Sequence, residues 1–189
     1  MTDDAASSIY TKTGDDGTTG LLFGGRLAKD DLIVEACGDV DEAVAALGMA
    51  RALLSDDLEL AALVLQVQRE LFIVAADLMA NPRARQHLVS GISLVESNMT
   101  SRIEAHIDRL IEQEPLRPVF IVPGATETSA ALDFARTVTR RAERHTIRAA
   151  RTHPSISSDV VMYLNRVSDL LYVLARLAAK SSDESASHL

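Results

Sequence analysis

The stretch LIVEACGDVDEAVAALGMARALL, residues 32–54, decides the fold class of this 189-residue chain. Its apolar residues recur at spacings of three and four, which places them on one face of an α-helix. Asp30 and Asp31 stand just before it, where a carboxylate accepts hydrogen bonds from the free N–H groups of a first helical turn. The stretch therefore predicts a long helix that buries one face against other elements.

Four more stretches share this helical pattern, over about 57–80, 93–113, 127–152 and 155–180. The expected N-caps are Asp57 for the first of them, Thr126 or Thr128 for the third, and Ser155, Ser157 or Ser158 for the fourth. Prolines follow the first, second and third of these stretches, and proline cannot continue a helix. Most connections are short, so we expect an all-α, five-helix up-and-down bundle.

The chain is expected to form one domain over residues 1–189, because its length fits a single core and no linker or repeat divides it. Residues 1–29 are rich in Gly, Asp, Thr and Ser and predict a loop. Residues 30–180 make up the helical bundle, with extended or polar connections at 81–92 and 116–125. Residues 181–189 predict a disordered tail.

Composition excludes several classes of protein. Aromatic residues make up 4% and tryptophan is absent, which favours helices over a β-sandwich. A net charge of −8 argues against nucleic-acid binding. No apolar run approaches the roughly 20 residues that span a membrane, and the N-terminus lacks signal-peptide features, so a cytoplasmic protein is expected. The lone Cys37 excludes an internal disulfide and is expected as a small core residue.

The segment YTKTGDDGTTGLLFGG, Tyr10–Gly25, is the first candidate binding element. Its glycines let the backbone approach a ligand closely, and its threonines and Lys12 offer hydroxyls and a positive charge. Backbone N–H groups in such a loop can hold an anion. It matches neither a Walker A loop nor an EF-hand. A flexible N-terminal arm is the alternative.

The second candidate is ARTVTRRAERHTIRAAR, residues 135–151, which holds six arginines and one acid, Glu143. A helix would place Arg136, Arg140 and Arg144 on one face, where like charges repel unless an anion or acidic side chains offset them. Arginine suits phosphate and carboxylate because its planar fork donates two parallel hydrogen bonds. A solvated face with structural ion pairs is the alternative.

Two further polar positions stay open from spacing alone. Asn165, inside the apolar helical pattern of residues 163–176, is either a ligand contact or part of an interhelical hydrogen bond. The acids of GDVDE, residues 38–42, pair with arginines or bind magnesium. No Glu-x-x-His pair, HExxH or GxSxG occurs, so neither a resident metal site nor a serine nucleophile is expected.

The blocks YTKTGDDGTTGL, GGR, AKDD, GDVDE, FIVPG, ARTVTRRAER and YLNRVSDLLYVLAR occur in this order from residue 9 to about 178. Together they make the chain resemble the PduO-type ATP:cob(I)alamin adenosyltransferases. That resemblance implies a homotrimeric helical bundle with active sites between subunits. It implies ATP with Mg²⁺, and cobalamin as the second substrate, in transfer of the 5′-deoxyadenosyl group of ATP to cob(I)alamin.

The resemblance also implies roles for individual residues. The expected ATP-binding positions are Tyr10, Thr11, Lys12, Thr13, Gly14, Asp15, Gly17, Thr18, Thr19, Lys29, Arg140, Arg141, Glu143, Arg144 and Asn165. Arg140 and Arg144 would act in catalysis with Phe120, which would pack near the corrin and help displace its lower axial ligand. Asp41 and Arg136 would pair across the subunit interface.

The implied chemistry explains why no proton-transfer constellation is present. Cobalt(I) attacks the 5′ carbon of the ribose and triphosphate leaves, so no general base is needed. Arginines, lysines and magnesium would stabilise the charge of the leaving group. A reductase would supply electrons, and an adenosylcobalamin-dependent mutase could receive the product.

The chain departs from the family pattern at Ala43, Val44, Ala125 and Asp133. A histidine is usual where Asp133 stands, and an acid there can pair with Arg136 and Arg140. The departures at Asp133 and Ala125 motivate an alternative, a non-catalytic carrier that binds ATP and adenosylcobalamin and delivers the cofactor to a mutase. A structural bundle without nucleotide affinity is a third possibility.

Overall fold

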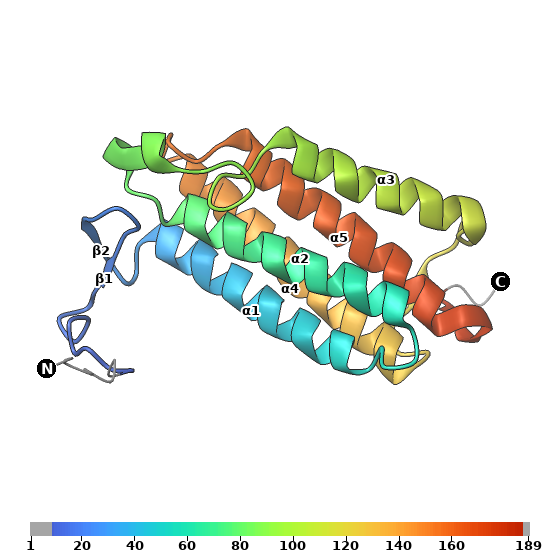
Figure 1. Cartoon of the computed structure of the whole chain (residues 1–189). Helices are drawn as coiled ribbons and strands as arrows, with labels where there is room; N and C mark the ends of the chain where they lie inside the picture. Colours follow the sequence, from blue (N-terminus) through green and yellow to red (C-terminus); the bar gives the residue numbers. More distant parts are fainter. Residues whose placement is uncertain (1–8, 187–189) are drawn as a thin grey trace, which may run out of the picture.

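The computed structural model describes residues 9–186; residues 1–8 and 187–189 lie outside this part. Five long helices lie lengthwise beside one another, and consecutive helices alternate in direction (Figure 1). They are α1 (Leu32–Ala52), α2 (Leu58–Leu78), α3 (Ser97–Gln113), α4 (Glu127–Ala150) and α5 (Ser158–Ala179). Helix α4 packs against both α1 and α5, α2 packs on α1, and α3 packs on α5. The predicted five-helix up-and-down bundle is confirmed.

The helices begin where short polar side chains accept the free N–H groups of the first turn. Asp31 accepts from Ile33 at 2.8 Å at the start of α1, and Asp57 accepts from Leu60 at 3.0 Å at the start of α2. Thr126 caps α4 in a reciprocal capping box, and Ser157 caps α5. These four caps were among those expected from the sequence.

Helix α3 begins four residues later than the expected residue 93. The side chain of Val95 is buried, so it continues the apolar pattern of the helix that follows. Its backbone N–H, however, donates to Oδ2 of Asp77 at 2.9 Å. That bond ties the segment before α3 to the end of α2, and helical periodicity cannot reveal it.

The bundle core is aliphatic and holds one buried tyrosine. Leu47, Leu71 and Leu164 are fully buried, as is Tyr163 on α5. The hydroxyl of Tyr163 donates to Oε2 of Glu70 on α2 at 2.6 Å. Burial, and then the Glu70 carboxylate, raise the pKa of Tyr163 well above its usual range. The tyrosine thus stays neutral and bonded, which satisfies two polar groups inside an apolar core.

The expected N-terminal loop contains a small hairpin. Strand β1, Thr18–Gly20, pairs antiparallel with β2, Arg26–Ala28, beside the start of α1 (Figure 1). Gly24 and Gly25 turn the chain between them with φ of 87° and 92°, a region that favours glycine. The chain between the strands is tied to the end of α2, because Leu22 donates to the carbonyl oxygen of Met79 at 2.8 Å.

The two connections expected to be irregular contain short regular elements. The 81–92 segment includes a 3₁₀ helix, η1, over Pro82–His87. The 116–125 segment includes strand β3, Ile121–Val122, which pairs antiparallel with β4, Glu184–Ser185.

The prediction of a disordered tail is therefore wrong for its described part. A 3₁₀ helix, η2 (Lys180–Ser182), continues from α5, and β4 follows it. The backbone pairing of β4 with β3, together with a buried ion pair of Asp183, supplies the order that composition does not show. The last three predicted tail residues, 187–189, lie outside the described residues.

Candidate active site

The hairpin gives the glycine- and threonine-rich segment a defined shape, and Arg26 holds it. The guanidinium of Arg26 donates to the carbonyl oxygen of Thr13 at 2.5 Å and to the hydroxyl of Thr18 at 2.7 Å. That hydroxyl in turn donates to Asp16 at 2.7 Å, and this bond lowers the pKa of Asp16. Arg26 and Asp16 were not singled out from the sequence, because contacts across a hairpin leave no local pattern.

Two lysines stand at this hairpin, and neither forms an ion pair within residues 9–186. The side chain of Lys29 lies against Gly14, where an added Cβ would come within 3.2 Å of the ammonium nitrogen. Gly14 thus leaves room for this charge. Lys12 has φ of 59°, a conformation rare outside glycine, and its ammonium lies 5.9 Å from the ring centre of Tyr10.

The arginines of RRAER, residues 140–144, have two different environments on α4. Arg141 turns toward α1, where its Nε donates to Oδ1 of Asp39 at 2.8 Å and it also pairs with Glu42. His145 contacts the other oxygen of Asp39. Asp39 is 9% exposed, so this part of the cluster holds α1 and α4 together. For Arg141, ion pairing within the protein is what the structure shows.

Arg140 and Arg144 remain exposed on α4, and neither has a carboxylate partner in the described chain. The Arg144 side chain donates a hydrogen bond to the carbonyl oxygen of Arg140 at 3.0 Å. Two neighbouring cations without compensating acids repel each other, so the arrangement favours an anion from outside the chain.

Asn165 and Glu143 are brought together across α5 and α4. The amide of Asn165 donates to Oε1 of Glu143 at 3.0 Å, and its oxygen accepts from Arg166 at 3.1 Å. Both interpretations of Asn165 from the sequence are therefore open, since an interhelical hydrogen bond is present and the residue remains partly exposed beside the arginine face.

A cavity of about 310 Å³ opens between α3, α4 and α5 beside Arg140. Arg136, Asp169 and Tyr172 line it together with apolar residues of α3. The guanidinium of Arg136 lies 5.9 Å from the ring centre of Tyr172. The cavity therefore joins a cationic rim to an apolar wall, a combination that suits an amphipathic ligand.

Asp41 and Arg136, the expected interface pair, do not meet within one chain. Asp41 is exposed on α1 and forms no ion pair among the residues described. Arg136 donates through Nε to Asp133 on its own helix at 3.0 Å. The expected pairing of Asp133 is confirmed for Arg136. Its second partner is Arg176 of α5 rather than Arg140.

Phe120 lies far from the hairpin. It belongs to the α3–α4 connection, at the end of the bundle opposite β1 and β2 (Figure 1). Phe120 is 89% exposed. No hydrogen bond or ion pair joins the hairpin to Arg140 or Arg144 within the described chain. One chain therefore presents three separate parts of the expected site and does not unite them.

Cys37 and the acids supply no alternative chemistry. Within the described residues, no group of three or more His, Cys, Asp or Glu side chains is placed to hold a metal ion. Cys37 is half-buried at the edge of the core, and burial raises the pKa of its thiol, which disfavours the nucleophilic thiolate. No helix within residues 9–186 is long and apolar enough to cross a membrane.

The family model of the cobalamin adenosyltransferases matches residues 9–178, which contain the hairpin, the α4 arginines, Phe120 and Asn165. The chain therefore belongs to the cobalamin adenosyltransferase family. It is 41% identical over 183 residues to a corrinoid adenosyltransferase of Mycobacterium leprae, covering 93% of each chain. It is 40% identical over 180 residues to the corrinoid adenosyltransferase PduO of Salmonella typhimurium, covering 93% of this chain and 50% of that protein.

Solved structures agree with this assignment. A phenylalanine-to-alanine variant of a PduO-type ATP:corrinoid adenosyltransferase from Lactobacillus reuteri, complexed with cobalamin and ATP, superposes with a TM-score of 0.82. It is 34% identical in sequence, and the match covers 94% of this chain and 97% of that one. An arginine-to-lysine variant of that enzyme, complexed with ATP, gives a TM-score of 0.80.

Proposed function

We propose that this protein transfers the 5′-deoxyadenosyl group of ATP to the cobalt(I) of a corrinoid, forming adenosylcobalamin and releasing triphosphate. Membership of the family and the relatives complexed with ATP and cobalamin support this activity. The observation that carries it is the pair Arg140 and Arg144, two exposed cations on α4 that have no acidic partner among residues 9–186. They are suited to the charge that develops on a leaving triphosphate.

The reaction itself makes limited demands on the protein. The cobalt–carbon bond forms with the electron pair of cobalt(I), and the bond between C5′ and the triphosphate oxygen breaks. The triphosphate leaves with the electron pair of the broken bond, so atoms and charges balance without proton transfer. The protein must hold the two substrates in line and stabilise the leaving group, which positioning and electrostatics can supply.

The hairpin would hold the nucleotide. Its backbone N–H groups, Lys12 and Lys29 provide donors and positive charge for phosphate oxygens. Gly14 leaves space for the Lys29 ammonium, and Arg26 fixes the carbonyl of Thr13. Mg²⁺ would be held mainly by the triphosphate, since the described residues form no acidic cluster for it.

A homotrimer would bring the separated parts together. The hairpin of one subunit would face Arg140, Arg144 and the Phe120 connection of its neighbour. Among the described residues, Arg136 bonds to Asp133 through Nε, which leaves its two terminal nitrogens for Asp41 of the next subunit. That pairing would give the exposed Asp41 a partner and Arg136 a second one. In the cytoplasm, a reductase would supply the electrons that reduce the corrinoid to cobalt(I), and a mutase could receive the product.

The test is an anaerobic assay with chemically reduced cobalamin, ATP and Mg²⁺. The corrin absorbance follows formation of adenosylcobalamin, and triphosphate is quantified separately. One triphosphate per adenosylcobalamin is the expected result. Binding of ATP and corrinoid without triphosphate release would instead identify the protein as a carrier. Absence of any nucleotide binding by calorimetry would leave only a structural bundle.

A further inference from the structure

The C-terminal segment folds back onto the connection that carries Phe120. Strand β4 pairs with β3, directly after Phe120, and the N–H of Ala186 donates to the carbonyl oxygen of Phe120 at 2.8 Å. Arg117, three residues before Phe120, donates to the carbonyl oxygen of Asp183 at 3.0 Å. The backbone on both sides of Phe120 is thus fixed, although the ring itself projects into solvent.

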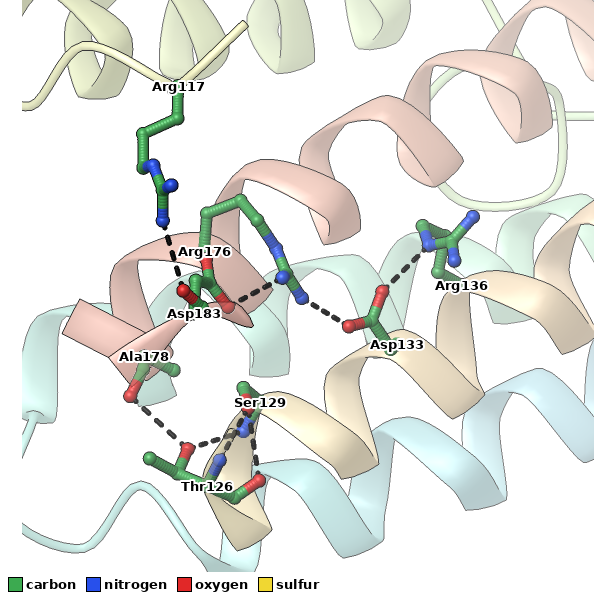
Figure 2. A network of polar contacts seen from close by, with 8 residues as sticks. All are labelled: Arg117, Thr126, Ser129, Asp133, Arg136, Arg176, Ala178 and Asp183. Carbon is green, nitrogen blue, oxygen red and sulfur yellow. Dashed lines mark hydrogen bonds and ion pairs between the residues drawn. The ribbon is translucent and has the colours of Figure 1, made fainter. Parts of the chain in front are cut away.

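Asp183 anchors this segment to the bundle through Arg176, as Figure 2 shows. Nη1 of Arg176 on α5 donates to Oδ1 of Asp183 at 2.7 Å, and Nη2 pairs with Asp133 on α4. The side chains of Asp183, Arg176 and Asp133 are 6%, 7% and 4% exposed. Removing one partner of so buried a set leaves an uncompensated charge, so each member depends on the others.

The network also reaches the arginine face. Asp133 accepts through its second oxygen from Nε of Arg136 at 3.0 Å (Figure 2). Arg136 lines the cavity beside Arg140. A continuous set of ion pairs therefore runs from the C-terminal segment, through α5 and α4, to the rim of the cavity.

We propose that Asp183 and Arg176 are positioning residues for Phe120: they lock the C-terminal strand against the Phe120 connection and so set where its ring meets the corrin. The proposal rests on the proposed adenosyltransferase activity, and it adds a role for a part of the chain that lies beyond residues 9–178 of the family match. Neither residue contacts a reacting atom.

The physical advantage lies in preorganisation. An exposed phenylalanine on a free loop would have to be ordered when the corrin binds, and that loss of conformational entropy would weaken the complex. Here β4 orders the backbone in advance. The ring then needs only to hold its side-chain angles to displace the lower axial ligand, the role that resemblance gives to Phe120.

Two variants test the proposal by different chemistry. Asp183→Asn removes the charge that pairs with Arg176, whereas Ala186→Pro changes no charge and removes the N–H that donates to Phe120. Glu184→Gln is the matched control, because Glu184 is an exposed acid on the same strand with no ion pair in the described chain. Hydrogen exchange of residues 117–122 and 183–186 reports release of the segment without any substrate.

Three functional readouts accompany the exchange data: KM for ATP, kcat, and the four-coordinate fraction of bound cobalt(II) cobalamin measured by electron paramagnetic resonance. We expect both variants to exchange faster. We also expect kcat and the four-coordinate fraction each to fall about five-fold, which is the effect expected from the loss of one hydrogen bond. KM for ATP should stay within about two-fold, because neither substituted residue contacts Lys12, Lys29, Arg140 or Arg144. Glu184→Gln should behave as the unmodified protein.

The outcomes separate this inference from the proposed function. If the unmodified protein shows no turnover, the adenosyltransferase proposal itself fails. If it turns over, and variants with faster exchange keep the same kcat and spectrum, the positioning role is overturned. Unchanged exchange in both variants would also overturn it, because the segment would then not depend on these contacts. Should Asp183→Asn fail to fold, Ala186→Pro, which alters no charge, decides whether the docked segment positions Phe120, the step on which the role of Asp183 and Arg176 depends.

Discussion

Arg141 donates through Nε to Oδ1 of Asp39 at 2.8 Å and thereby joins α4 to α1 near the middle of their packed faces. The same carboxylate contacts His145 one turn further along α4. Strong hydrogen bonding, first to Asp39 and then to Glu42, raises the pKa of Arg141 still further, so it stays charged. An arginine expected to bind ATP therefore also holds two helices together.

This relationship predicts that Asp39→Ala destabilises the bundle. Removal of the nearly buried carboxylate leaves Arg141 and His145 without their shared acceptor, and we expect a loss of about 1–3 kcal/mol in unfolding free energy. Urea unfolding measures it. Glu42→Gln is the control: Glu42 is half exposed, so its loss should cost less than about 1 kcal/mol. Equal costs for the two variants would contradict the structural role of Asp39.

Arg140→Ala should remove most of the activity and leave the fold intact. Loss of one preorganised donor to a developing oxyanion costs about 100-fold to 1,000-fold in kcat. Arg148→Ala is a matched control, because Arg148 is exposed on the same helix and has no ion pair among the described residues. Kinetics of both variants, with circular dichroism as a check of folding, decide the matter. Full activity of Arg140→Ala would remove Arg140 from the site.

Lys12→Ala examines the hairpin in the same assay. Lys12 has a left-handed backbone, its ammonium lies over the ring of Tyr10, and it has no ion-pair partner in the described part of the chain, so it could meet phosphate. Alanine removes this charge, and we expect a fall of at least about ten-fold in ATP affinity by calorimetry. Unchanged affinity would assign the triphosphate to Lys29 and the arginines alone.

Asp41→Ala should weaken assembly if Asp41 reaches Arg136 of a neighbouring subunit. We expect a cost of about 1–3 kcal/mol per interface, because Arg136 would keep only its bond to Asp133. Sedimentation velocity over a range of concentrations measures the trimer–monomer equilibrium. The same trimer stability in both proteins would show that Asp41 has no partner there.

Periodicity predicted the helices because burial of one face leaves a pattern in every turn. The caps Asp31, Asp57 and Ser157 could also be predicted, because each bonds to a residue two or three positions further along the chain. The hairpin and β4 were missed, since strands of two or three residues have no period to detect. The start of α3 was misplaced for a related reason: the bond from Val95 to Asp77 is invisible to any local pattern.

In the candidate site, too, local sequence blocks were recognisable, whereas contacts between distant residues were not. Family blocks singled out Arg140, Arg144 and Asn165 as candidates, and their roles stay predictions. The block GGR contains Arg26 but did not show that this residue shapes the hairpin, and no block showed the pairing of Asp133 with Arg176. Those contacts join residues that are far apart in the chain or on opposite strands, so only the folded structure brings them together. Asp133 appeared as a departure from the family pattern before its partners were visible.

The buried Tyr163–Glu70 pair makes the free energy of unfolding fall as the pH rises above about 10. In the unfolded chain a tyrosine ionises near pH 10, whereas burial raises the pKa of Tyr163 in the folded protein well above that value. Above pH 10 the folded state therefore holds one more proton than the unfolded state at this position, and stability must fall as pH rises further. Below pH 10 the residue contributes no slope.

Tyr163→Phe separates this effect from other titrations. The variant should lose about 1–2 kcal/mol at pH 7, because the buried Glu70 loses a hydrogen bond of 2.6 Å and keeps Arg102 and Gln66. Its stability should decline less steeply between pH 10 and 11 than that of the unmodified protein. Tyr172→Phe, which removes a hydroxyl from a tyrosine at the cavity, is the matched control and should keep the steep decline. Parallel slopes for the unmodified protein and Tyr163→Phe in urea titrations would show that Tyr163 ionises no later when folded than when unfolded.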